Sequence, residues 1–250
     1  MRILVVFIAT LSCALAWAQN SSTNHQALPY WLGVGLIYNQ MDYEEPDVMT
    51  EKGANGGLHL DVGYLLLPNI SVNLDAKYWD GRLKYDGATF GGTPVKTQTA
   101  DILSDNRIYF NYSGATTTFS VGYGQRYWYN DLIISYRRKT TYNFVPLKGT
   151  LRSGSFYYSF EYNLWLGGVN KSFMSDTGGG RNDVTMDLDS GSGMALEWGY
   201  VHGATPVARA FLRIEKWDVD DSETAFDGVD NLVEPKNNTL TIMIGSGLIW

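Results

Sequence analysis

Hydrophobic and polar residues alternate strictly along residues 58–78. Every second residue of the arms 58–66 and 70–78 is apolar, and most residues between them are polar or charged. Pro68-Asn69 separates the two arms as a tight turn. Because neighbouring side chains of a strand point to opposite faces, this pattern predicts a hairpin with one apolar and one polar face. Arms of about 9–11 residues with a polar second face are typical of transmembrane strands, which face lipid on one side and a lumen on the other.

The same alternation recurs along the rest of the chain. It predicts further strands at 29–43, 119–127, 132–136, 144–152, 156–166, 184–200, 208–217 and 239–250. Polar residues 44–55 are predicted as an acidic loop, and residues 81–115 as a long extracellular loop with strand extensions near 108–112. Asn130-Asp131 is predicted to form a turn, and the stretch 137–141 a basic loop tip.

About ten strands result, and their connections alternate between short turns and long loops, as in bacterial outer-membrane barrels. We therefore predict an all-β fold, a transmembrane up-and-down antiparallel β-barrel of about ten strands. Counts of eight or twelve stay open because Pro146 weakens the strand at 144–152.

The N-terminus carries the pattern of a secretory signal peptide. Arg2 precedes an apolar run, and Ala16-Trp17-Ala18 forms an A-x-A cleavage site. This pattern predicts a signal peptide at 1–18, a disordered tail at 19–28 and a barrel at 29–250, in the outer membrane of a Gram-negative bacterium. The single cysteine, Cys13, raises the alternative of a lipoprotein signal, but Thr10 stands where such signals usually carry leucine. Cleavage after Ala18 leaves no cysteine for a disulfide or a thiolate metal site.

Composition narrows the class of protein further. The formal net charge of −7 argues against a nucleic-acid partner. Aromatic residues make up 14% of the chain, which suits the aromatic girdles of a membrane barrel.

The signal sequence, the alternating strands and the terminal stretch LTIMIGSGLIW resemble bacterial outer-membrane β-barrel proteins over the whole mature chain. The last strand, which ends at Trp250, is similar to the signal read by the barrel-assembly machinery. The resemblance implies this machinery, outer-membrane lipid and lipopolysaccharide as partners. The stretches YGQRYWYNDL, FEYNLWLGGVNKSFMSD and VEPKNN look like those of poorly characterised porin-like proteins.

The second half also resembles the layout of omptins, ten-stranded outer-membrane proteases whose strands project beyond the bilayer. Omptin chemistry uses a pair of Asp residues that faces an Asp-His pair at the rim. The matching stretch SFMSDTGGGRND contains Asp176 and Asp183 but no histidine. The resemblance therefore implies the architecture without the protease site.

Strand parity places a set of ionisable side chains on the inner face. In a narrow barrel these groups have to pair, because an isolated charge away from water is costly. Barrels of this size are filled largely by side chains, whereas aqueous porins usually have about 16 strands or more. We predict a salt-bridged plug and a structural or interaction role, and a narrow channel for small solutes stays open as the alternative. The predicted lumen residues are His59, Asp61, Asp75, Lys77, Arg126, Glu161, Glu197, Arg209, Arg213 and Glu215.

No catalytic motif stands out. His59 and Asp61 share a face and could serve acid–base chemistry, but neighbours of this kind are ordinary in a half-polar strand. No GxSxG nucleophile motif occurs. We therefore predict no enzyme, no cofactor and no metal site. An omptin-like or lipid-modifying enzyme at the rim stays a second alternative.

Charged loop residues suggest two further contacts. Acidic side chains gather in two predicted loops, where divalent cations could bind, but the absence of EF-hand spacing favours solvated charge. These residues are Glu44, Glu45, Asp47, Asp218, Asp220, Asp221, Glu223 and Asp227. Arg137, Arg138 and Lys139, placed on the loop side, are predicted to meet lipopolysaccharide phosphates, although such residues also snorkel at strand ends.

Overall fold

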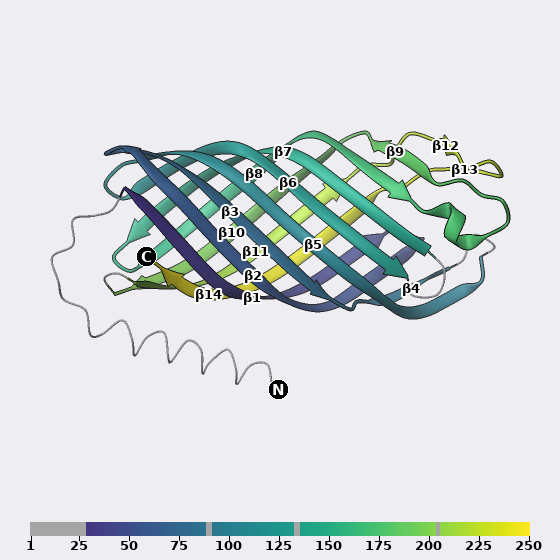
Figure 1. Cartoon of the computed structure of the whole chain (residues 1–250), viewed down its shortest axis with the longest axis horizontal. Coiled ribbons are helices and arrows are strands. Elements are labelled where there is room, and N and C mark those ends of the chain that lie inside the picture. The colour runs from purple at the N-terminus through teal and green to yellow at the C-terminus, as the bar shows by residue number, and fades with distance from the viewer. Residues whose placement is uncertain (1–28, 89–91, 133–135, 204–205) are drawn as a thin grey trace.

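The computed structural model describes residues 29–88, 92–132, 136–203 and 206–250. The predicted signal peptide, the predicted tail, Cys13 and His25 lie outside these residues. Within the described part, ten strands form one closed antiparallel barrel (Figure 1). The wall strands are β1 (Tyr30–Glu45), β2 (Met49–Leu67), β3 (Ile70–Gly81), β5 (Pro94–Ser113), β6 (Thr117–Leu132), β7 (Tyr136–Ser153), β8 (Phe156–Ser172), β10 (Gly191–His202), β11 (Val207–Val219) and β14 (Asn237–Ile249).

The first and last strands close the cylinder. β1 pairs with β2 along one edge and with β14 along the other. Leu32 and Trp250 exchange backbone hydrogen bonds of 3.0 and 2.9 Å at the end of this seam. Since each wall strand runs antiparallel to its neighbours, both ends of the wall lie at the same end of the barrel as the shortest turns (Figure 1). The predicted up-and-down β-barrel of ten strands is confirmed.

Short elements extend the wall at the opposite end, which we call the loop end. β4 (Lys84–Ala88) continues β3 and pairs with β2 and β5, and β9 (Val184–Leu188) continues β10 along β8. The 3₁₀ turn η2 (Met174–Thr177) and the strands β12 (Ala225–Phe226) and β13 (Asn231–Leu232) lie in the two longest loops. The described chain contains no apolar helix of bilayer-spanning length.

Two predicted connections are wrong, and their effects on the predicted number of strands cancel. Residues 81–115 are no loop, because β5 occupies most of them and pairs with β3 and β6 over its length. The turn predicted at Asn130-Asp131 lies inside the ladder of β6 with β7. The strand predicted at 132–136 is not a separate element, since Leu132 ends β6, Tyr136 begins β7 and residues 133–135 lie outside the described part. The strand predicted at 144–152 is part of β7, which runs unbroken past Pro146 with one register shift at Asn143/Phe144. One strand was missed and one predicted strand does not exist as such, so the total is right.

The predicted acidic loop at 44–55 is also wrong. β1 and β2 are joined by residues 46–48 alone, where Asp47 adopts a left-handed conformation with φ of 62°. Aspartate tolerates this conformation better than most residues because its short side chain can hydrogen-bond locally. The tight link turns Glu45 and Glu51 into strand residues that face the lumen.

The apolar faces of the strands point outward. Leu60, Phe160 and Leu212 are 37%, 52% and 37% exposed, although they lie in the middle of long strands. On β8 the outward apolar positions run from Phe156 to Leu166, and this length matches a strand crossing a bilayer. Closer to the loop end the outward positions become polar, as at Gln40. The strands therefore continue beyond the apolar band.

Candidate functional site

Six buried ionic side chains fill the middle of the lumen. Arg107 on β5 reaches Glu161 on β8 and Glu215 on β11, each at 3.2 Å. Arg213 lies 2.8 Å from Glu161 and 2.6 Å from Glu215, and Arg126 lies 2.8 Å from Glu215. None is more than 4% exposed, and positive and negative groups balance. We call this set the central plug, and its members are Asp105, Arg107, Arg126, Glu161, Arg213 and Glu215.

A second group of ion pairs adjoins the plug on the side of the short turns. Arg209 bridges Asp61 at 3.2 Å and Glu197 at 3.0 Å. His59 lies 3.3 Å from Asp75, whose carboxylate also contacts Lys77. The partner of His59 is thus Asp75 and not Asp61. Since His59 is only 6% exposed, its ring belongs to the lumen network and is closed to a substrate.

The structure places all ten predicted lumen residues on the inner face and joins them in these contacts. Sequence reasoning missed Asp105 and Arg107, because it assigned their strand to a loop. The signal was available, since both residues share parity with Tyr109 and Asn111 in the stretch that was recognised as a strand extension. Arg107 is the larger omission, because its guanidinium contacts three of the plug carboxylates.

Aromatic rings cover the plug toward the loop end. Phe144 packs edge-on against Trp217 with ring centroids 4.9 Å apart, and Tyr142 lies 5.7 Å from the same indole. The guanidiniums of Arg107 and Arg126 lie 5.3 Å and 5.8 Å from the rings of Phe144 and Trp217. Cation–π contact of this kind stabilises a charge that burial has removed from water. The rings therefore add a dry layer above the ionic one.

A third layer closes the loop end around Arg138. Its guanidinium lies 2.9 Å from Glu234 and 3.8 Å from Glu51, and it contacts Glu45. We call Arg138, Glu45, Glu51 and Glu234 the rim cluster. Arg138 is 4% exposed and faces inward, so its predicted contact with lipopolysaccharide is wrong. The prediction failed because the supposed basic tip is a regular part of β7, where alternate residues face opposite sides.

The acidic excess of the rim cluster predicts a pH-sensitive loop. Glu234 lies in the connection between β13 and β14, and burial raises the pKa of its carboxyl to about 7 although Arg138 opposes the shift. Because this pKa lies above the usual 4.5, the stabilisation is full below pH 4.5 and is lost as the pH rises through 7. We expect protease cleavage within residues 220–236 to accelerate between pH 5 and pH 8, relative to an unstructured peptide substrate.

Two variants make this expectation specific. Glu234→Gln keeps an acceptor for Arg138 but carries no charge, so its relative cleavage rate should rise less over the same pH range than that of the wild type. Glu223→Gln removes an exposed acid from the same loop and should keep the wild-type profile. Identical profiles for Glu234→Gln and the wild type would contradict the assignment.

The outer face of the loop end carries a small basic patch. Arg137 forms a bidentate pair with Asp176 at 2.6 and 2.7 Å, and Lys139 stands directly across from Lys171 on β8. Like charges placed opposite each other are unfavourable unless an anion lies between them. Lipopolysaccharide contact by Arg137 and Lys139 stays a prediction.

The remaining loop acids have local partners. Asp183 accepts hydrogen bonds from Ser175, and neither described histidine, His59 or His202, contacts it or Asp176. Among the described residues no group of three or more His, Cys, Asp or Glu is arranged to hold a metal ion. The paired acids of the last loop are Asp218 with Lys216, Asp220 with Lys236, and Asp227 with Arg181.

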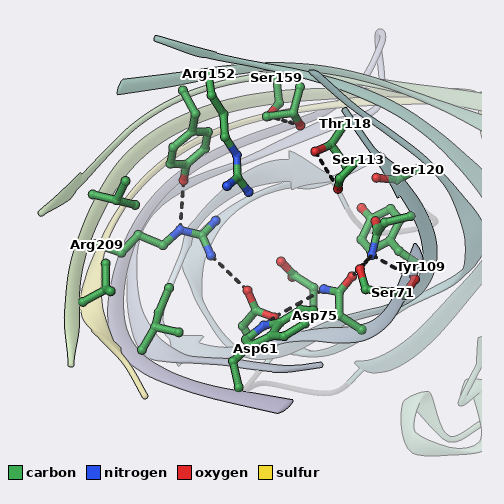
Figure 2. A pocket seen from close by; sticks show the side chains of 18 of the residues that line it. Asp61, Ser71, Asp75, Tyr109, Ser113, Thr118, Ser120, Arg152, Ser159 and Arg209 are labelled. Carbon is green, nitrogen blue, oxygen red and sulfur yellow. Dashed lines mark hydrogen bonds and ion pairs between the residues drawn. The ribbon is translucent and has the colours of Figure 1, made fainter. Parts of the chain in front are cut away.

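On the side of the short turns the lumen is hollow. A cavity of about 730 Å³, which we call the cup, lies between the ion pairs of Arg209 and the barrel mouth. Figure 2 shows Asp61, Arg152 and Arg209 directed into it from different parts of the wall. Much of the remaining lining consists of hydroxyl and amide side chains.

The closed antiparallel wall carries an apolar band on its outer face and ion pairs on its inner face. These features together identify the class of protein. The chain is a β-barrel of the outer-membrane type. No family model matches the sequence, and no curated protein matches it.

Among solved structures, this barrel is similar to the P. putida toluene transporter TodX, with 8% identity, a TM-score of 0.39 and 90% of each chain covered. It is also similar to the translocator domain of the autotransporter NalP from Neisseria meningitidis, with 11% identity, a TM-score of 0.38 and coverage of 98% of this chain and 95% of that one. A loop-deleted form of OmpT, an outer membrane protein of Vibrio cholerae, shows 14% identity, a TM-score of 0.34 and coverage of 85% and 62%. Such low identities transfer no activity to this chain.

Proposed function

We propose that the protein is a structural or interaction barrel of the Gram-negative outer membrane whose lumen is closed to solutes. The observation that carries the proposal is the ion pair of Arg107 with Glu215, because β5 and β11 are opposite strands of the ten-stranded wall. A contact between opposite strands crosses the full width of the lumen. Closer to the loop end, the aromatic layer and the rim cluster obstruct the lumen at two further levels.

The proposal orients the barrel by its connections. Short turns and both ends of the wall face the periplasm, and the loops that carry η2, β12 and β13 face outside, as in other barrels of this class. Trp250 directly follows β14, the strand that closes the wall, and the proposed signal for the barrel-assembly machinery lies there. The proposal assigns no reaction to the rim, since the carboxylate of Asp176 is occupied by Arg137.

Conductance tests the closed lumen directly. We expect purified, folded protein to give no stable unitary current steps in a planar bilayer, because three layers of buried side chains obstruct the lumen. Heat-dependent migration on gels establishes that the sample is folded, and protease protection in vesicles establishes that it is inserted. Reproducible unitary steps from such a sample would overturn the proposal and favour the narrow channel.

A further inference from the structure

The cup is a large hollow within the lumen, and its shape suits a ligand. Ion pairs of Arg209 and Asp75 form its floor, and the mouth opens between the short turns. Its volume of about 730 Å³ lies within the usual range for small-molecule sites, about 300–1,000 Å³. A molecule the size of one or two sugar rings can therefore enter without any rearrangement of the wall.

Hydroxyl and amide groups line the wall of the cup in pairs. Ser113 lies 3.1 Å from Thr118, and Thr150 lies 2.8 Å from Ser159. Asn111 donates to Asn73 at 2.9 Å. Each hydroxyl can both donate and accept, so such a wall matches the mixed donors and acceptors of a polyol.

The charge left over in the cup is positive. The carboxylates of Asp61 and Glu197 share the guanidinium of Arg209, and that of Asp75 contacts Lys77, so these five groups leave one negative charge. Arg152, in contrast, makes no ion pair or side-chain hydrogen bond in the described chain, and its side chain points into the hollow near that of Arg209 (Figure 2). Lys148 lines the same wall and interacts electrostatically with Glu197, so its charge offsets the remaining negative one and the charge left over is that of Arg152. A guanidinium held free in this way offers paired donors to a carboxylate or phosphate.

Two rigid aromatic side chains flank these groups. The indole of Trp31 lies flat over Gly63, where a Cβ would approach the ring to 1.9 Å, and its Nε1 donates to Asp61 at 3.0 Å. Tyr157 lies over Gly199 in the same way, and its hydroxyl accepts from Arg209 at 2.9 Å. Both rings are fixed before any ligand arrives, so they are preorganised beside the polar wall, where Tyr157 contributes only its exposed edge because it is 9% exposed.

We propose that the cup binds a small polyhydroxylated anion, a sugar acid or a sugar phosphate. Arg152 and Lys148 receive the acidic group, the hydroxyl and amide pairs receive the ring hydroxyls, and Trp31 and Tyr157 cover the apolar faces of the ring. The assignment rests on the proposed function only for the side of entry, which is the periplasm.

Calorimetric titration of the folded full chain in detergent micelles, at constant ionic strength, tests this site with four probes. We expect glucuronate and glucose 6-phosphate to bind at least tenfold more tightly than glucose, which lacks the charge, and than acetate, which lacks the hydroxyls. Arg152→Gln should weaken both charged sugars by about tenfold, because a charge-assisted contact is lost. Arg152→Lys should restore part of this loss.

Lys96→Gln is the matched control, since it removes a positive charge from an exposed position outside the cup. It should leave all four affinities unchanged. Absence of binding by either charged sugar, equal binding of glucuronate and acetate, or an unaffected Arg152→Gln variant overturns the site. Unitary currents with intact sugar binding would overturn the closed lumen alone, so the two proposals fail separately.

Discussion

Replacing Arg107 by methionine is expected to lower the free energy of unfolding by about 3–5 kcal/mol. Arg107 is 1% exposed and contacts Asp105, Glu161 and Glu215, so its removal leaves carboxylates buried with too little positive charge. Methionine replaces much of the volume of the arginine side chain. The loss of stability therefore reports the missing charge and not a cavity. Urea unfolding of the protein in lipid vesicles, followed by tryptophan fluorescence, measures the difference.

Arg152→Met provides the comparison on the same inner face. Arg152 is exposed in the cup and has no ion pair in the described chain, so its replacement should change the free energy of unfolding by no more than about 0.5 kcal/mol. Similar losses for the two variants would contradict the central plug as a set of mutually dependent charges.

Phe160→Arg is expected to destabilise the membrane-inserted barrel by about 2–4 kcal/mol. Phe160 lies in the middle of the outward apolar run of β8 and is 52% exposed, so a guanidinium there would stand in hydrocarbon. Unfolding from vesicles of defined acyl-chain length measures the effect, which should grow in thicker bilayers.

Gln40→Arg places the same charge on the outer face beyond the apolar band, where it should cost no more than about 1 kcal/mol. Equal effects at Gln40 and Phe160 would show that the outward apolar face does not meet lipid. The membrane assignment would then be wrong, together with the orientation built on it.

The errors of sequence reasoning have one physical cause. Hydrophobic and polar residues alternate where one face of a strand contacts lipid and the other faces the lumen. The alternation is lost where a strand extends beyond the bilayer, because both of its faces are polar there. In β5 four of the six outward positions between 96 and 106 are polar, namely Lys96, Gln98, Ser104 and Asn106, so the loop-end part of that strand resembles a loop. In β7 the outward residues Lys139 and Asn143 are also polar and Pro146 follows them, so part of this strand was predicted as a loop tip.

The residues that line the lumen were predicted correctly wherever the strand that carries them was recognised. Strand parity alone placed Glu161, Arg213 and Glu215 on the inner face. Charged groups on the inner face of a narrow barrel have to pair, because an isolated buried charge is costly. Which residues pair was beyond the sequence, since pairing depends on the register between strands, both adjacent and opposite. His59 meets Asp75 on the neighbouring strand, and not Asp61 two residues away, for this reason. The rim cluster needed the three-residue link at 46–48, which no hydrophobic pattern reveals.

The pairing of Arg107 with Glu215 joins residues 108 positions apart in the chain. Chain synthesis has almost finished before the second partner exists, and contacts of such wide sequence separation form late in folding. Until then these charges need water around them. We therefore expect the interior of the half-assembled protein to be wet, and to lose its water only when β11 comes to lie opposite β5.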